Sequence, residues 1–332
     1  MTQQKKYKLV IDGSGFVGSF LIKEFQDDSV INFDKNPSPF FNKITTIGNI
    51  LDLEGFDKIF KDVETVILLA AEHRDDVSPI SMYYDVNVRG TKNILDKMDK
   101  FQIKNLVFTS SVAVYGLNKK NPNENHKKDP FNHYGKSKWL AEQAIKEWYD
   151  NNPVGKSVTI IRPTVIFGER NRGNVYNLLK QISSGKFIMI GKGDNIKSMA
   201  YVGNVVAFIK SRLLNKKMGY QIFNYVDKPD YKMNELVSII ETKMELNSSN
   251  FKLPYWLGYL GGLCFDFFSL LSGKKFPISA VRVKKFCATT QFDAEKVHKC
   301  FDAPFKLKNG LDKTLEHEFI NPKEDDILFY SE

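Results

Sequence analysis

Short apolar segments alternate with amphipathic segments through the first half of the chain. Five apolar runs have the length of buried strands, at 7–11, 30–33, 65–69, 105–109 and 158–162. Helical patterns lie between them, following the first run to about residue 25 and again near 79–100 and 134–150. Strands that alternate with helices form βαβ units, so this pattern predicts an α/β fold with a doubly wound parallel sheet.

The regular alternation weakens after about residue 168. Residues 171–193 and 201–214 still predict helices, whereas the last third is irregular and contains a strongly apolar stretch at 253–272. We therefore expect a first domain over 1–168 with a return segment near 196–212. A smaller substrate-binding lobe is expected over 169–332, and it includes the apolar stretch.

The composition narrows the class of protein. The chain has 332 residues, 42% hydrophobic and 26% charged, which excludes a disordered or collagen-like protein. The net charge of +9 favours an anionic partner, either nucleic acid, phosphate or diphosphate groups, or an acidic membrane; a solvated basic surface is the alternative. No nucleic-acid-binding module is recognisable. Three cysteines without metal-ligand spacing, no secretory segment and no long apolar run predict a cytoplasmic protein that binds no metal and does not span a membrane.

A glycine-rich turn separates the first strand from the first helix. Gly13, Gly15 and Gly18 have the G-x-G-x-x-G spacing in which the backbone approaches a pyrophosphate at a helix N-terminus. Asp34 ends the second strand, in place to accept a hydrogen bond from a ribose 2′-hydroxyl. This combination predicts a Rossmann-type domain that prefers NAD to NADP. A glycine-rich turn of another doubly wound protein is the alternative.

A tyrosine and a lysine lie four residues apart on the helix predicted near 134–150. Tyr134 and Lys138 therefore share one helix face, where an ammonium would favour the phenolate and make the tyrosine a general base near neutral pH. Ser111 follows the buried strand 105–109, at the sheet edge where open α/β folds bind ligands. The three side chains predict a catalytic group, with a surface helix pair as the alternative for the first two.

Further motifs add to this pattern. They are Leu69-Ala70-Ala71, Asn87-Val88-x-Gly90-Thr91, Val114-Tyr115-Gly116, Arg162-Pro163, and the C-terminal segments 290–296 and 310–314. With the glycine turn and the Tyr134/Lys138 pair, they resemble the extended short-chain dehydrogenase/reductase family, over nearly the whole chain. Segments 70–78, 132–139 and 162–177 are similar to one bacterial branch, 4-epimerases that act on N-acetylglucosamine carried by undecaprenyl diphosphate for O-antigen synthesis.

The resemblance implies an enzyme and a role for each matching residue. Tyr134 would be the base, Lys138 would tune it, and Ser111 would orient the sugar O4. The residues implied in NAD binding are Gly13, Gly15, Phe16, Val17, Gly18, Asp34, Asn49, Ile50, Leu69, Ala70, Ala71, Asn87, Tyr134 and Lys138. Residues considered for the substrate, a polyprenyl-diphosphate-linked amino sugar, are His73, Arg74, Arg162, Asn174 and Lys197.

The chain departs from the family pattern at several positions. Asp12 stands where the family has a glycine, and we expect its carboxylate to point away from the pyrophosphate so that NAD still binds. Val165, Lys197 and the pair Gly203-Asn204 replace residues common in enzymes of nucleotide sugars, which weakens the case for a UDP-sugar substrate. A UDP-sugar 4-epimerase, an NAD(P)H-dependent 4-keto-sugar reductase and a non-catalytic NAD-binding protein are the alternatives.

The apolar stretch is followed by basic residues. Residues 255–271 are rich in aromatic and aliphatic side chains, and the cations after them are Lys274, Lys275, Arg282, Lys284 and Lys285. An apolar face with flanking cations is typical of a segment that lies in a membrane interface. The sequence therefore predicts peripheral contact with the cytoplasmic face of the inner membrane. A buried helix or a homodimer contact is the alternative for this stretch.

Overall fold

The computed structural model describes residues 6–25, 29–74, 77–247, 251–273 and 279–330. Within them, a parallel sheet of seven strands has the order β10-β6-β5-β4-β1-β2-β3. Its strands are β1 (Tyr7–Ile11), β2 (Val30–Asp34), β3 (Thr45–Ile47), β4 (Val63–Leu68), β5 (Asn105–Thr109), β6 (Ser157–Pro163) and β10 (Gly219–Tyr225). The predicted doubly wound parallel sheet is confirmed.

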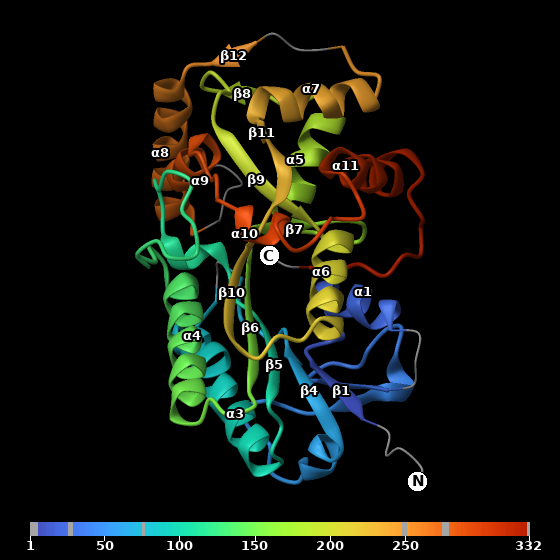
Figure 1. The fold of residues 1–332 in the computed structure, drawn as a ribbon. Helices are drawn as coiled ribbons and strands as arrows, with labels where there is room; N and C mark the ends of the chain where they lie inside the picture. The colour runs from blue at the N-terminus through green and yellow to red at the C-terminus, as the bar shows by residue number, and fades with distance from the viewer. Residues whose placement is uncertain (1–5, 26–28, 75–76, 248–250, 274–278, 331–332) are drawn as a thin grey trace.

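Helices cover both faces of this sheet, and successive strand residues supply the two cores. Leu9 and Ile11 pack with the helices α3 (Thr91–Lys100) and α4 (His133–Asn151). Val10, between them, packs with α1 (Phe16–Glu24) and α6 (Val202–Leu214) on the other face (Figure 1). Strands that are buried on both faces have apolar residues at successive positions. The apolar runs in the sequence therefore predicted these strands correctly.

The remaining elements form a second lobe beyond the carboxyl ends of the sheet strands (Figure 1). It contains a three-stranded sheet, β11-β9-β7, and a two-stranded sheet, β12-β8. Its strands are β7 (Val165–Phe167), β8 (Met189–Ile190), β9 (Ile196–Tyr201), β11 (Asp227–Lys232) and β12 (Lys252–Leu253). Its helices are α5 (Asn174–Ser183), α7 (Met233–Lys243), α8 (Tyr255–Ser272), α9 (Ala280–Cys287), α10 (Glu295–His298) and α11 (Leu307–Leu315).

Two predicted segments differ from the structure. The helix expected over 171–193 is only α5, because the chain turns at Gly185 with a left-handed φ of 69° before β8. The helix expected near 79–100 is divided into α2 (Ser81–Tyr84), a π-helical turn at Asp85–Gly90, and α3. The return segment expected near 196–212 corresponds to β9 and most of α6, and the chain then adds β10 to the sheet.

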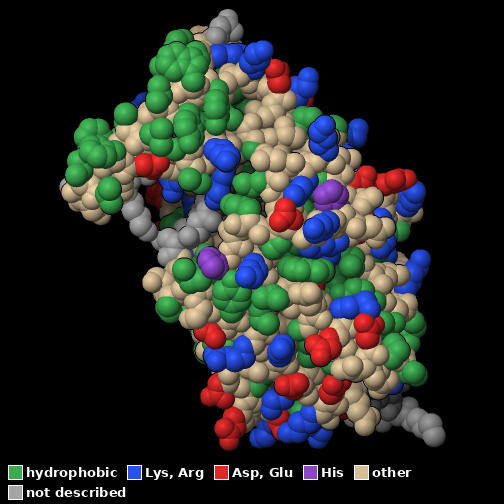
Figure 2. All heavy atoms as spheres, turned by 90° about the vertical axis from the view of Figure 1, so that its left-hand side faces the viewer, with side chains coloured by type: hydrophobic (Ala, Val, Ile, Leu, Met, Phe, Trp, Pro, Cys, Tyr) green, Lys and Arg blue, Asp and Glu red, His purple; other side chains and the backbone are tan. Residues whose placement is uncertain are grey.

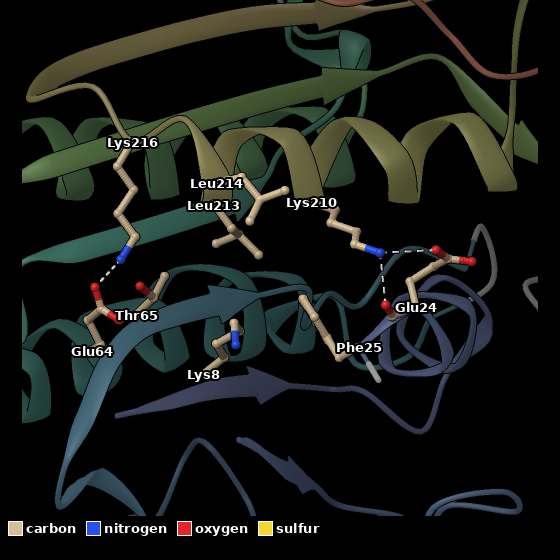
Figure 3. A pocket seen from close by; sticks show the side chains of 9 residues that line it. All are labelled: Lys8, Glu24, Phe25, Glu64, Thr65, Lys210, Leu213, Leu214 and Lys216. Atoms are coloured by element: carbon tan, nitrogen blue, oxygen red, sulfur yellow. Dashed lines mark hydrogen bonds and ion pairs between the residues drawn. The ribbon is translucent and has the colours of Figure 1, made fainter. Parts of the chain in front are cut away.

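A surface cavity lies at the amino ends of β1 and β4, between α1 and α6 (Figure 3). Its lysines already have partners: Lys210 donates to Glu24, and Lys216 pairs with Glu64. The strands' carboxyl ends, where the predicted site residues occur, are at the opposite edge of the sheet. This cavity therefore contributes nothing to the candidate active site.

Helices α8 and α9 form a hairpin that depends on a close backbone approach. A Cβ at Gly262 would lie 2.6 Å from the Ala280 nitrogen, so only glycine lets the two helices meet here. Asp266 accepts a hydrogen bond from the same nitrogen at 3.0 Å, which fixes the start of α9. Of the residues of α8, Gly258 and Gly262 are buried, whereas nearly all the others face outward.

Replacing Gly262 by alanine is therefore expected to open the hairpin. The added methyl group meets backbone atoms, which cannot rotate away, and overpacking of this kind costs about 1–3 kcal/mol. Limited proteolysis should then cleave 255–287 about tenfold faster or more, because cleavage follows the open population. Gly261→Ala is the matched control, since nothing lies within 4 Å of its Cβ position. Equal cleavage rates in the two variants would contradict this account.

Candidate active site

The glycine turn brings the N-terminus of α1 against the end of β1. A Cβ at Gly13 would lie 2.4 Å from the Asn32 amide oxygen, and one at Gly18 would lie 2.4 Å from the Gly13 Cα. These two glycines allow close packing. Among the described residues only Asp12 has atoms near the Cβ position of Gly15, at 3.7 and 3.9 Å, so the start of α1 is open at Gly15. Phe16 and Val17, which were predicted to bind the cofactor, pack against the core.

The end of β2 forms one wall of a groove. Asp34 accepts hydrogen bonds from the backbone nitrogens of Ser14 at 2.9 Å and Asn36 at 2.8 Å, which fixes its carboxylate beside the turn. The groove brings together most of the residues predicted to contact the adenosine and nicotinamide parts of NAD. It is lined by Ile11, Asp12, Phe33, Asp34, Lys35, Gly48, Asn49, Ile50, Ala70, Ala71 and Val86.

Asp12 also lines this groove, which contradicts the expectation that its side chain turns away. One carboxyl oxygen lies 3.9 Å from the Cβ position of Gly15, and the carboxyl group hydrogen-bonds Asp34. The reason is the backbone: Asp12 has a left-handed φ of 66°, and its nitrogen donates to the Phe33 carbonyl at 2.9 Å. That turn directs the side chain toward Gly15 rather than away from it.

Asn87, which is predicted to bind the cofactor, has side-chain hydrogen bonds within the protein. Its amide oxygen accepts from the Glu72 nitrogen at 2.8 Å, and its two N–H groups donate to the Glu72 carbonyl and the Ser137 hydroxyl. Ser137 in turn donates to the Tyr134 carbonyl at 2.8 Å. Asn87 therefore fastens the loop after β4 to the first turn of α4. Leu69, also in the predicted set, is buried in the core.

The three predicted catalytic residues meet at the carboxyl edge of the sheet. Helix α4 begins at its cap Asn132, whose side chain accepts from the Gly135 nitrogen at 2.9 Å, and this fixes Tyr134 in the first turn. Ser111, just after β5, hydrogen-bonds the Tyr134 hydroxyl. Burial raises the pKa of Tyr134 above its usual value, while the Ser111 hydrogen bond acts in the lowering direction.

Lys138 is fully buried one turn further along α4. Burial lowers its pKa to about 7, while the carboxylates of Glu142 and Asp12 act in the opposite direction. Its ammonium lies 4.3 Å from the centre of the Phe108 ring. The sequence predicted that this ammonium lowers the pKa of the Tyr134 phenol. In the structure burial raises this pKa, and Ser111 rather than Lys138 acts in the lowering direction.

The residues of the groove fit a dinucleotide. Among the described residues the Lys138 nitrogen has no hydrogen-bond partner, although it is buried. An orphaned buried donor is costly, so it indicates a ligand hydroxyl at this point. The open start of α1 at Gly15 provides the positive helix end that a pyrophosphate requires. Asp34 lies in the wall of this groove at the end of β2, and its contact with a ribose hydroxyl stays a prediction.

Arg162, a predicted substrate residue, is instead part of the core. It is 0% exposed and forms a two-pronged ion pair with Glu142 of α4, at 2.9 and 2.5 Å. Ser110 also donates to Glu142, and Arg162 donates to the Tyr115 hydroxyl at 2.7 Å. Arg162 and Glu142 are 20 residues apart and lie on different elements, so no local spacing in the sequence signals this pairing.

The other predicted substrate residues are not gathered into one group by their contacts. Lys197 donates to the carbonyls of Lys285 and Ala288, and burial lowers its pKa to about 8. It therefore links β9 to the chain after α9. His73 and Arg74 are exposed after β4, with Arg74 3.3 Å from the Glu72 carboxylate. Asn174 is exposed at the start of α5.

Comparison with known proteins shows the family to which the chain belongs. Residues 9–224 match the NAD dependent epimerase/dehydratase family. The chain belongs to this family. Membership confirms the predictions of the family, of an enzyme and of NAD as its cofactor.

Individual family members support the assignment. The chain is 60% identical to N-acetyl-alpha-D-glucosaminyl-diphospho-ditrans,octacis-undecaprenol 4-epimerase of Escherichia coli O157:H7, over 98% of each chain. It is 25% identical to UDP-glucose 4-epimerase of Vibrio cholerae, over 93% of this chain and 94% of that one. The solved structure of MoeE5 in complex with UDP-glucose and NAD has the same fold, with a TM-score of 0.73, 21% identity and coverage of 93% and 97%.

The Arg162–Glu142 pair leads to a prediction for this family member. Glu142→Gln keeps the side-chain volume but leaves the Arg162 charge buried without its counterion, which costs about 3–5 kcal/mol. The midpoint of urea unfolding should fall accordingly. Lys146→Met on the same helix breaks the exposed pair with Asp150 and a cation–π contact with Tyr220, and it should cost about 1 kcal/mol or less. Similar losses in the two variants would show that burial of the pair contributes nothing.

Proposed function

We propose that this protein interconverts the C4 epimers of a lipid-linked amino sugar, N-acetylglucosaminyl-diphospho-undecaprenol and its N-acetylgalactosaminyl counterpart. The observation that carries the proposal is the 60% identity, over nearly the whole chain, to an enzyme named for this reaction. The retained Ser111, Tyr134 and Lys138 support it, because their contacts are those a proton transfer at O4 needs. The product would serve the synthesis of O-antigen or another surface polysaccharide.

The proposed mechanism assigns each side chain one task. Tyr134 removes the proton from the 4-hydroxyl group, and Ser111, which already hydrogen-bonds Tyr134, orients the same oxygen. Lys138, whose nitrogen has no hydrogen-bond partner among the described residues, would hold the nicotinamide ribose. Bound NAD would supply the hydride acceptor and donor for C4. Tyr134 then gives its proton back to the 4-keto oxygen, after the sugar has turned over in the site.

Proton transfer also requires the pKa of Tyr134 to fall from its buried value. The Ser111 hydrogen bond already acts in this direction, whereas burial acts against it. Lys138 is one helical turn away, and the Glu142 carboxylate raises its pKa against the effect of burial. We therefore infer that Glu142 keeps Lys138 protonated, so that it can stabilise the phenolate during the reaction.

Residues other than Ser111, Tyr134 and Lys138 bear on whether the sugar is carried by a nucleotide diphosphate or by a lipid diphosphate. Lys197 stands where enzymes of nucleotide sugars commonly have an arginine, and its ammonium already donates to two backbone carbonyls. Val165 at the start of β7 is an exposed apolar residue rather than an amide. Neither side chain is suited to hold a nucleotide diphosphate tightly, which supports a lipid diphosphate as the carrier.

The activity assay compares the two carriers directly. Purified protein is offered N-acetylglucosaminyl-diphospho-undecaprenol and UDP-N-acetylglucosamine in parallel, and epimers are separated chromatographically. We expect turnover of the lipid-linked sugar and at least about a hundredfold lower turnover by Tyr134→Phe, because the general base is lost. Turnover of the UDP-sugar alone would reject the proposed carrier. Full activity of Tyr134→Phe would reject the proposed base.

We also propose that α8 rests in the cytoplasmic face of the inner membrane. Trp256, Leu270 and Leu271 are 60%, 82% and 68% exposed, and with their neighbours they make a large apolar surface at one end of the molecule (Figure 2). Soluble monomers rarely leave such a patch uncovered. No helix among the described residues is long and apolar enough to cross a membrane.

The charges near this surface favour an anionic bilayer. Arg282, Lys284 and Lys285 lie on α9, which packs directly against α8. Lys274 and Lys275, predicted to take part, lie outside the described residues. Cations beside an apolar helix are attracted to acidic headgroups while the apolar side chains enter the interface. A substrate anchored in the bilayer by its polyprenyl chain would then be within reach of the enzyme.

Flotation with vesicles tests this surface. Wild-type protein should float with phosphatidylglycerol vesicles and less with phosphatidylcholine, and a Phe267→Ser/Leu271→Ser variant should remain in the soluble fraction. Leu214→Ser is the matched control, since this leucine is equally exposed but lies at the end of α6. Wild-type protein that stays soluble, and forms a dimer that the α8 variant lacks, would assign the surface to a second copy of the chain instead.

A further inference from the structure

Asp12 places a carboxyl group at the point where the groove should receive a diphosphate. It is the last residue before the glycine turn, and its left-handed φ of 66° is one that aspartate tolerates better than most side chains. One carboxyl oxygen lies 3.9 Å from the Cβ position of Gly15, at the open start of α1. An ionised carboxylate here would repel the two negative charges of a bound pyrophosphate.

The surroundings of Asp12 show which of its two forms the protein supports. Three charged groups act on the pKa of the Asp12 carboxyl group: the Asp34 carboxylate, with which it hydrogen-bonds, and the ammonium groups of Lys35 and Lys138. Burial in the groove also acts on it. Asp34 and Lys35 come from the end of β2, and Lys138 from α4. Burial and the nearby Asp34 raise the pKa of Asp12 to about 7, with the two lysines opposing this.

The two carboxyl groups differ in their hydrogen-bond donors. Asp34 accepts backbone N–H groups at both of its oxygens, from Ser14 and from Asn36. Asp12 has no such donors among the hydrogen bonds of the described part of the chain, and it can donate its own proton to Asp34. Two carboxyl groups in contact cannot both remain ionised without a large penalty.

We propose that Asp12 must be protonated for NAD to bind, so that cofactor binding by this enzyme takes up a proton at alkaline pH. In its neutral form the side chain is no longer an anion beside the pyrophosphate, and it can donate a hydrogen bond to Asp34 or to a phosphate oxygen. The inference rests on the proposed assignment of the groove to NAD. Under this proposal the protonation state of Asp12 changes the affinity for NAD. The glycine that the family has at this position carries no charge and would have no such effect.

The direction of the pH dependence follows from linkage. Below about pH 7 the free protein already holds the proton on Asp12, so binding requires no uptake and the association constant is nearly flat. Above this pH the free protein has lost the proton and must recover it on binding. The association constant should then fall, by up to about tenfold for each pH unit.

Titration calorimetry of NAD-free protein with NAD, at pH 6 and pH 8.5, tests the proposal. Repeating each titration in two buffers of different ionisation enthalpy measures the proton uptake directly, independently of catalysis. We expect nearly no uptake at pH 6 and an uptake approaching one proton at pH 8.5. Asp12→Asn, which keeps the size and the backbone preference, and Asp12→Gly should bind with smaller uptake, and more tightly than wild type at pH 8.5.

Two results would overturn the inference in different ways. Lys138 also titrates near neutral pH, but it is present in wild type and in both variants. If both variants keep the wild-type proton uptake, the proton belongs to another group such as Lys138, and the role of Asp12 is rejected. If neither wild type nor Asp12→Gly binds NAD at any pH, the assignment of the groove to NAD fails, and the proposed function fails with it.

Discussion

The buried ion pair between Arg162 and Glu142 joins the parts of the protein on which the active site depends. Arg162 comes from β6 and Glu142 from α4, so one pair fastens the helix with the proposed catalytic residues to the sheet. A buried pair is tolerated only when its remaining donors and acceptors are satisfied, and here Ser110 and Tyr115 do this. Glu142 lies one turn beyond Lys138, so the same carboxylate also contributes to the charge state of that lysine.

Features with a strong local signal were predictable from the sequence. The parallel sheet followed from continuous apolar runs, since strands covered on both faces have little choice of residue. The spacing of Gly13, Gly15 and Gly18 located the turn, and the spacing of Tyr134 and Lys138 placed both on α4. Each of these inferences needed only a local pattern and the period of a helix or strand.

Features set by tertiary contacts were not predictable in this way. The roles of Asn87 and Arg162 depend on partners 15 to 50 residues away, which no local pattern reveals. The orientation of the Asp12 side chain depends on its left-handed backbone. The family pattern has glycine at this position, so it gives no information about where a side chain would point. Burial likewise reversed the expected direction of the Tyr134 pKa, because it outweighs the hydrogen bond from Ser111.

Strand β10 affects how the chain folds during its synthesis. β10 pairs with β6 along its whole length, yet the second lobe's α5, β8 and β9 lie between them in the sequence. During synthesis, β6 therefore remains an unpaired edge until residues 219–225 emerge, and unpaired edges promote aggregation. The seven-stranded sheet cannot be completed before part of the second lobe has been made, so the two lobes must be assembled together.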